Sequence, residues 1–81
     1  MTPTEIAEEI KRELTDDPTI EGARHIYVYS KKKGIWPFRT AAIYLAGDVH
    51  KESDKQKAME HAKHAAGDTE VFNEIIITPA R

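Results

Sequence analysis

The residues best suited to bind a metal are three histidines in the second half of the chain. His61 and His64 are three residues apart, and His50 precedes them. A metal site needs three or four converging ligands with supporting groups around them. The sequence places only one such pair and fixes no carboxylate beside it. We therefore expect solvated histidines, no metal site and no cofactor.

Acids and bases are plentiful, but their arrangement does not predict catalysis. None lies in a Gly-rich phosphate loop, a nucleophile elbow or a metal motif. Glu8, Glu9 and Glu13 follow helical spacing and predict a solvated helix face. The chain has no cysteine, which excludes disulfides and thiolate chemistry. We expect no catalytic residues and a protein that is not an enzyme.

Charge is distributed unevenly along the chain. The formal net charge is -2 over 81 residues. Counting charged residues gives net -5 for residues 1–22, +5 for residues 23–39 and -2 for residues 40–81. The middle segment contains no acid, and it is the charge feature that most requires a functional explanation.

A basic and aromatic loop lies within that segment. Its candidate ligand- or membrane-binding residues are Lys31, Lys32, Lys33, Trp36, Phe38 and Arg39. Aromatic rings beside cations suit the interface of a bilayer that contains anionic phospholipid. They also suit single-stranded nucleic acid. A third interpretation is that the rings fold back over the sheet edge and the lysines only solvate it. Because the rest of the chain carries net -7, we disfavour nucleic acid as the partner.

Two helices are predicted by capping residues and apolar spacing. Thr2, Pro3 and Glu5 form a capping box with proline in the first turn, and the Asp17-Pro18 step ends the helix. This predicts a helix over about 3–15. A second capping box beginning at Ser53, followed by an alanine stripe and Gly67, predicts a helix over about 54–66.

Three strands are predicted by alternation of apolar residues. They cover about residues 25–30, 40–49 and 71–78, with residues 31–39 as a long hairpin loop. Gly47 within the second strand predicts a bulge or a close backbone approach by the second helix. The expected core consists of apolar residues on the inward parity of each element: Ile6, Ile10, Leu14, Ile26, Val28, Ile43, Leu45, Ala62, Val71, Ile75 and Ile77.

The strand residues that point away from the expected core predict an aromatic face on the other side of the sheet. Its candidate interface residues are Tyr27, Tyr29, Tyr44, Phe72 and Ile76. A contiguous apolar face of this kind usually marks a contact with a partner. The partner is either another protein or a second copy, which would form a homodimer. The alternative is an open face that is only half apolar.

These elements predict an α+β fold of order α-β-β-α-β. The hairpin makes the first two strands antiparallel, and the helical crossover makes the second and third parallel. The result is a three-stranded mixed sheet with two helices packed on one face, in one domain over residues 1–81.

Several motifs in this order resemble a known family. Residues 43–49 have the form hydrophobic-x-Leu-x-Gly-x-Val, and residues 71–77 have the form Val-x-Asn-x-Ile-x-Ile. With Ala58, Ala62 and Ala66 between them, they resemble the BON domain, a small module of bacterial envelope-associated proteins. The resemblance covers nearly the whole chain and implies binding to phospholipid membranes or to other proteins, without catalytic residues. The family usually closes this hairpin with a tight turn, whereas residues 31–39 form an enlarged loop here.

The N-terminal residues and the lack of a long apolar run predict where in the cell the protein lies. Residues 1–14 carry early acids and no apolar signal core, and no run of 18 apolar residues exists to span a membrane. We expect a stand-alone cytoplasmic copy of the domain that associates with membranes peripherally. Its leading function is that of a binding module for anionic phospholipid, and the alternative is a structural or oligomerising domain that uses the tyrosine-rich sheet face.

Overall fold

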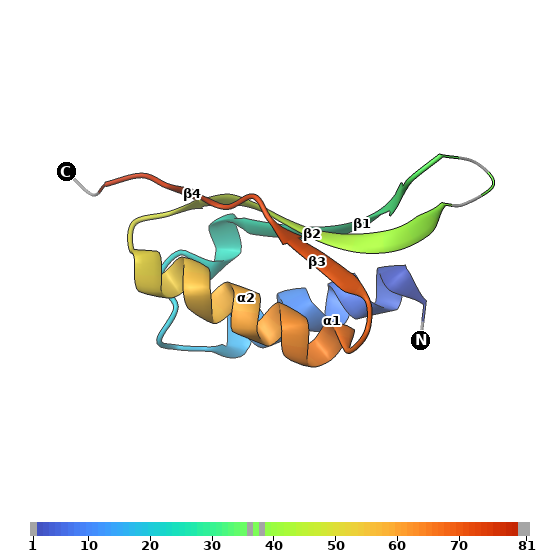
Figure 1. Cartoon of the computed structure of the whole chain (residues 1–81). Coiled ribbons are helices and arrows are strands. Elements are labelled where there is room, and N and C mark those ends of the chain that lie inside the picture. Colours follow the sequence, from blue (N-terminus) through green and yellow to red (C-terminus); the bar gives the residue numbers. More distant parts are fainter. Residues whose placement is uncertain (1, 36, 38, 80–81) are drawn as a thin grey trace.

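The computed structural model describes residues 2–35, 37 and 39–79 of the chain. Two helices lie on one side of a mixed sheet, which confirms the predicted α+β class and the order α-β-β-α-β (Figure 1). The elements are α1 (Pro3–Asp16), η1 (Ala23–His25), β1 (Ile26–Lys33), β2 (Thr40–Val49), α2 (Glu52–Ala66), β3 (Glu70–Asn73) and β4 (Ile76–Ile77).

Helix α1 begins at the predicted capping box. The Thr2 hydroxyl accepts a hydrogen bond from the Glu5 backbone N–H at 3.2 Å, and the Glu5 carboxylate accepts one from the Thr2 backbone N–H at 3.3 Å. The two bonds satisfy backbone donors that the first helical turn leaves free. The helix buries Ile6, Ile10 and Leu14 against the sheet, as the spacing predicted.

The start of α2 differs from the prediction. The helix begins at Glu52 with Lys51 as its N-cap, and no side chain caps it. The predicted capping box at Ser53 is therefore wrong, because Ser53 already lies inside the first turn and the Asp54 N–H bonds the Lys51 carbonyl at 3.2 Å. The alanine stripe was predicted correctly: Ala58 and Ala62 are fully buried, and such short side chains let the helix approach the sheet closely.

The strand order in the sheet is β1-β2-β3, with β4 also pairing with β2. β1 and β2 are antiparallel, while β2 and β3 are parallel. The last predicted strand is divided in two because the chain bends at Asn73: its side-chain oxygen accepts the Ile75 N–H at 3.1 Å, and its amide donates to the Lys55 carbonyl of α2 at 3.3 Å. This bend places Ile75 in the core, where it is 2% exposed.

The hairpin is longer and more ordered than a loop over residues 31–39 would be. β1 continues to Lys33, and Lys31, Lys32 and Lys33 pair with Ala42, Ala41 and Thr40 of β2. The prediction that the lysines lie in the loop is therefore wrong, because backbone pairing with β2 carries the strand beyond its apolar residues. The hairpin extends past the helix layer (Figure 1).

The core is the layer between the sheet and the two helices. Of the predicted core residues, Val28, Val71 and Ile77 are partly buried against it and the others are buried. The prediction missed Ile20, which lies in the segment between α1 and β1 and is 5% exposed.

Gly47 has a role in the hairpin that the prediction identified only in part. Its φ is +112°, and a Cβ atom at this position would lie 2.0 Å from the His25 carbonyl oxygen. A side chain cannot be accommodated at that distance. The close approach predicted from the sequence is present, but the near backbone is that of residue 25 and not that of the second helix.

Candidate functional site

The described part of the basic hairpin lies at one end of the molecule. We use this name for residues 31–39, of which Trp36 and Phe38 lie outside the described residues. Lys31, Lys32 and Arg39 are exposed, and Ile35 is 85% exposed. Because side chains alternate along a strand, Lys31 and Lys33 share the helix-free face with the tyrosines, and Lys32 points to the other side. The cations therefore lie on both sides of the hairpin.

Lys33 differs from its two neighbours in its contacts. Its ammonium group lies 4.3 Å from the centroid of the Phe72 ring and 3.4 Å from a carboxylate oxygen of Glu70. These contacts hold the side chain back over β3 through cation–π attraction and ion pairing. The Lys33 ammonium group is therefore directed toward β3.

The predicted aromatic face exists, and its rings form a stack across three strands. Tyr29 and Tyr44 stack with centroids 5.4 Å apart, and Tyr44 and Phe72 stack at 5.1 Å. The strand register explains the row, since Tyr29 pairs with Tyr44 and Tyr44 pairs with Phe72. Tyr44 has a neighbouring ring on each of its faces. That arrangement leaves it no free face for a nucleic-acid base, which stacking recognition requires.

The remaining two residues of this face project further into solvent. Tyr27 is 62% exposed and Ile76 is 65% exposed. Tyr29 donates a hydrogen bond from its hydroxyl to Glu74 at 3.4 Å. Partial burial, and then the neighbouring Glu74 carboxylate, raise the pKa of Tyr29 above its ordinary value. The five predicted interface residues thus lie on one surface, which contains the stack of Tyr29, Tyr44 and Phe72 together with Tyr27 and Ile76.

A third group of polar residues lies where α1 and α2 meet, and the sequence did not predict it. His61 lies 2.8 Å, through Nε2, from Asp17 Oδ2 and 3.7 Å, through Nδ1, from Glu13 Oε1. His61 is 29% exposed. The expectation that this histidine is solvated is therefore wrong, whereas His64 is 84% exposed as expected.

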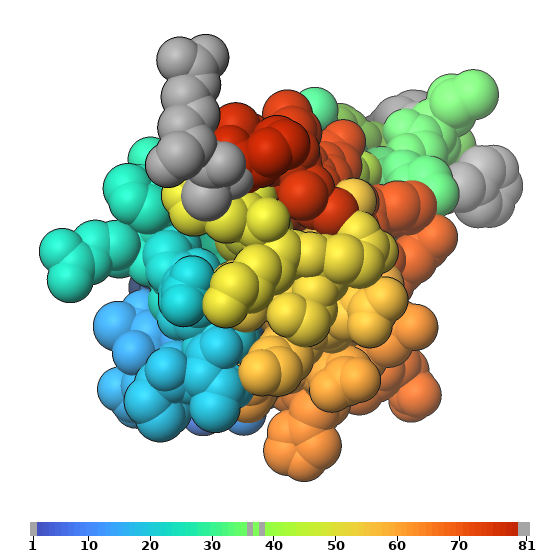
Figure 2. Space-filling view, turned by 90° about the vertical axis from the view of Figure 1, so that its left-hand side faces the viewer, coloured from blue at the N-terminus to red at the C-terminus, as the bar shows by residue number. Residues whose placement is uncertain are grey.

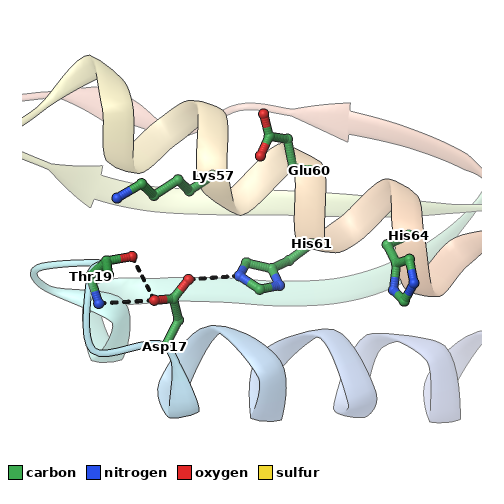
Figure 3. A pocket seen from close by; sticks show the side chains of 6 residues that line it. All are labelled: Asp17, Thr19, Lys57, Glu60, His61 and His64. Atoms are coloured by element: carbon green, nitrogen blue, oxygen red, sulfur yellow. Dashed lines mark hydrogen bonds and ion pairs between the residues drawn. The ribbon is translucent and has the colours of Figure 1, made fainter.

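The Asp17 side chain is held in place by hydrogen bonds from Thr19, two residues further along the chain. Its Oδ1 accepts hydrogen bonds from the Thr19 hydroxyl at 2.6 Å and from the Thr19 backbone N–H at 2.9 Å (Figure 3). The Thr19 hydroxyl, the His61 hydrogen bond and the Thr19 backbone amide together lower the pKa of Asp17 well below its ordinary value. The segment that carries Asp17 and Thr19 lies beside the first part of α2 in Figure 2.

Lys11 of α1 contacts the backbone at the beginning of the edge strand β1. Its ammonium group donates to the Ala23 carbonyl at 3.1 Å and to the Ile26 carbonyl. Partial burial lowers the pKa of Lys11. The contacts assign Lys11 a structural role, because they join α1 to η1 and to the first residue of β1, which is an edge strand.

Comparison with known proteins identifies the family. A family model described as the BON domain matches residues 39–79, about half of the chain. The chain belongs to the BON domain family. The matched region contains β2, α2, β3 and β4, and α1 and β1 precede it. No curated protein and no solved structure matches the chain.

Family membership agrees with the described geometry of this BON domain. The family is one of binding modules, which is consistent with a non-enzymatic binding role. Neither helix, within the part of the chain that the structure describes, has the length and apolar content of a membrane span.

Proposed function

We propose that this BON domain is a non-enzymatic binding module that contacts anionic phospholipid headgroups through the basic hairpin. The observation that supports the proposal best is the extension of the hairpin past the helix layer, with exposed Lys31 and Lys32 beside an 85% exposed Ile35 (Figure 1). The proposed contact residues are Lys31, Lys32, Lys33, Trp36, Phe38 and Arg39. Ile35 joins them.

The two kinds of side chain contribute in different ways. A basic side chain near an anionic membrane surface contributes about 1 kcal/mol, and this attraction decays within a Debye length. Apolar and aromatic side chains enter the headgroup region and add an attraction that salt does not screen. Binding should therefore have a salt-dependent part from the lysines and a salt-independent part from Ile35 and Trp36.

The position of the hairpin makes this contact geometrically feasible. A projecting hairpin can reach a surface while the net negative body of the domain stays away from it. The net charge is -2 for the chain and +5 for residues 23–39, so the body repels the anionic surface that the hairpin attracts. We expect the two effects to orient the domain with the hairpin toward the membrane.

Co-sedimentation with liposomes tests the proposal. The double variant Lys31→Gln/Lys32→Gln should bind liposomes containing anionic lipid about 30-fold more weakly, which is about 2 kcal/mol. Its salt dependence should be flatter. The matched control Lys51→Gln/Lys63→Gln removes the same charge from exposed positions at the two ends of α2 and should bind nearly as the parent does. Trp36→Ala should weaken binding and leave the salt dependence unchanged.

Two results would contradict the proposal. One is equal loss of binding in the hairpin variant and the α2 control, which would indicate only a net-charge effect. The other is equal binding to neutral and anionic liposomes. A titration with a single-stranded oligonucleotide completes the test, because stacking on Trp36 would quench its fluorescence if nucleic acid were the partner.

A second candidate function is a protein contact through the aromatic face. It is favoured by the exposure of Tyr27 (62%) and Ile76 (65%) on the side of the sheet that no described helix covers. Sedimentation equilibrium at high micromolar concentration tests self-association. If the parent dimerises and Tyr27→Ser/Ile76→Ser is monomeric, the face is the interface. A monomeric parent would exclude the homodimer.

A further inference from the structure

The outer side of β1 is an open edge of the sheet. Among the described residues the strand order is β1-β2-β3 and β4 pairs with β2, so no strand pairs with β1 on its outer side. β1 is eight residues long, whereas β3, at the opposite edge, has four. A long open edge offers unpaired backbone N–H and C=O groups to which a further strand can bind.

The hydrogen bonds of β2 show how the backbone of β1 is oriented. The Leu45 carbonyl accepts the Glu74 N–H at 2.8 Å, so the backbone groups of Leu45 point toward β3. Because this direction alternates along a strand, the groups of Tyr44 point toward β1, where Tyr44 pairs with Tyr29. The N–H and C=O of Tyr29 therefore point toward β2, and those of its neighbours in β1 point outward.

Three residues of β1 direct their backbone groups to the open edge. They have the parity opposite to Tyr29 and are Val28, Ser30 and Lys32. The contact of Lys11 agrees with this parity, because its ammonium group reaches the carbonyl of Ile26, which precedes Val28 by two residues. Lys11 thus occupies the first outward position, and the next three each keep one N–H and one C=O for a partner.

The side chains along this part of the edge are cationic. Lys31 and Lys32 are adjacent, so they lie on opposite faces of the strand, and both are exposed. Residues 23–39 contain five Lys or Arg residues and no Asp or Glu. A strand added to this edge would therefore have an ammonium group near each of its faces. A second copy of β1 would bring the same lysines and no acid to the ladder, which disfavours self-pairing here.

We propose that the outer side of β1 binds an extended acidic segment of another protein as an additional β-strand. Backbone hydrogen bonds to Val28, Ser30 and Lys32 would supply affinity. Carboxylates beside Lys31 and Lys32 would select acidic sequences. The strand rises about 13 Å from Val28 to Lys32, which is the length of about five extended residues. The proposed lipid contact uses the same lysines but not the backbone, so the two can be tested separately.

Fluorescence anisotropy with the intact chain and a labelled heptapeptide of alternating glutamate and valine tests the proposal. The parent should bind this peptide saturably, and at least about 10-fold more tightly than a peptide with lysine in place of each glutamate. The same acidic sequence with N-methylated backbone amides should not bind measurably, because it cannot donate hydrogen bonds to a strand edge. This comparison separates strand pairing from attraction between charges alone.

Ser30→Pro tests the edge from the side of the protein. The Ser30 N–H points outward, so this change removes an outward donor and leaves the bonds to β2 in place, and edge strands accept proline at such positions. Peptide binding should weaken at least about 10-fold, while the matched control Ser30→Ala should bind as the parent does. Both variants keep the lysines and should bind anionic liposomes normally, whereas Lys31→Gln/Lys32→Gln should weaken both kinds of binding.

Amide hydrogen exchange followed by NMR decides the question even if Ser30→Pro does not fold. In the free chain the amides of Val28 and Ser30 should exchange much faster than that of Tyr29, and saturating acidic peptide should slow them. Three results would each overturn the proposal: no saturable binding, equal binding of the N-methylated or lysine peptide, or unchanged exchange at Val28 and Ser30. The lysines would then only guard the edge against other strands.

Discussion

Replacement of Gly47 by alanine tests the central contact of the hairpin. The native φ of +112° costs a residue with a Cβ atom about 1–2 kcal/mol. In addition, the new Cβ would lie 2.0 Å from the His25 carbonyl oxygen, whereas a carbon–oxygen contact is normally about 3.3 Å. The start of β1 would have to move by more than an ångström.

That movement would weaken the pairing of Ile26 with residue 47 and loosen Ile26, which is fully buried. Each hydrogen bond lost costs about 1 kcal/mol, and disturbed packing adds a similar amount. We expect Gly47→Ala to lower the free energy of unfolding by about 3–5 kcal/mol. For a domain of this size, with a total of roughly 4–12 kcal/mol, this is a large fraction.

Urea unfolding followed by circular dichroism measures the loss, and Gly22→Ala is its matched control. Gly22 also has a positive φ of +73°, but a Cβ atom there would lie at an ordinary 3.6 Å from the nearest side-chain atom. The control should lose only the backbone cost of about 1–2 kcal/mol. If Gly47→Ala is no less stable than Gly22→Ala, the proposed steric role of the His25 carbonyl is refuted.

Three further predictions concern the burial of Leu45 and the pKa shifts of Asp17 and Tyr29. Leu45→Ala should cost about 2–5 kcal/mol in urea unfolding, because Leu45 is fully buried, and a loss under about 0.5 kcal/mol would contradict the strand register. The folded-state pKa of Asp17 is lowered, so its contribution to stability is present above about pH 4 and lost as the pH falls below that value; acid titration of unfolding should show a shallower loss for Asp17→Asn. The folded-state pKa of Tyr29 is raised, so its contribution is present below about pH 10 and lost as the pH rises through the folded pKa; absorbance at 295 nm should show a late tyrosine that Tyr29→Phe removes.

The features that the sequence predicted correctly are set by residues close together in the chain. The capping box of α1 joins Thr2 to Glu5, and the aromatic row follows from alternation within each strand. Local patterns are sufficient for the cap because both residues lie in one turn, and for the aromatic row because the face of each ring is set within its own strand. The pairing of Tyr44 with Phe72 depends in addition on the crossover from β2 to β3. The same local reasoning failed at Ser53, where backbone geometry, and not a capping side chain, begins the helix.

The features that were missed depend on contacts between distant segments. The His61–Asp17 contact joins residues 44 positions apart, and nothing in either helix shows which faces will meet. Asp17, the C-cap of α1, follows Glu13 by four residues, and His61 and His64 are nearly one turn apart on α2. Those spacings were visible in the sequence. Their convergence depends on how the two helices pack against the sheet.

The face of the hairpin on which each lysine lies also depends on Gly47, at the opposite end of the β1–β2 ladder. Gly47 pairs with Ile26 at one end of the β1–β2 ladder, and Lys33 pairs with Thr40 at the other. Because side chains alternate, a slip of one residue would move Lys31 and Lys33 to the helix side and Lys32 to the aromatic face. The close approach at Gly47 opposes such a slip, since any other residue would bring a Cβ atom against the His25 carbonyl. The glycine of the family motif would thereby determine, along eight paired positions, which face of the hairpin each lysine occupies.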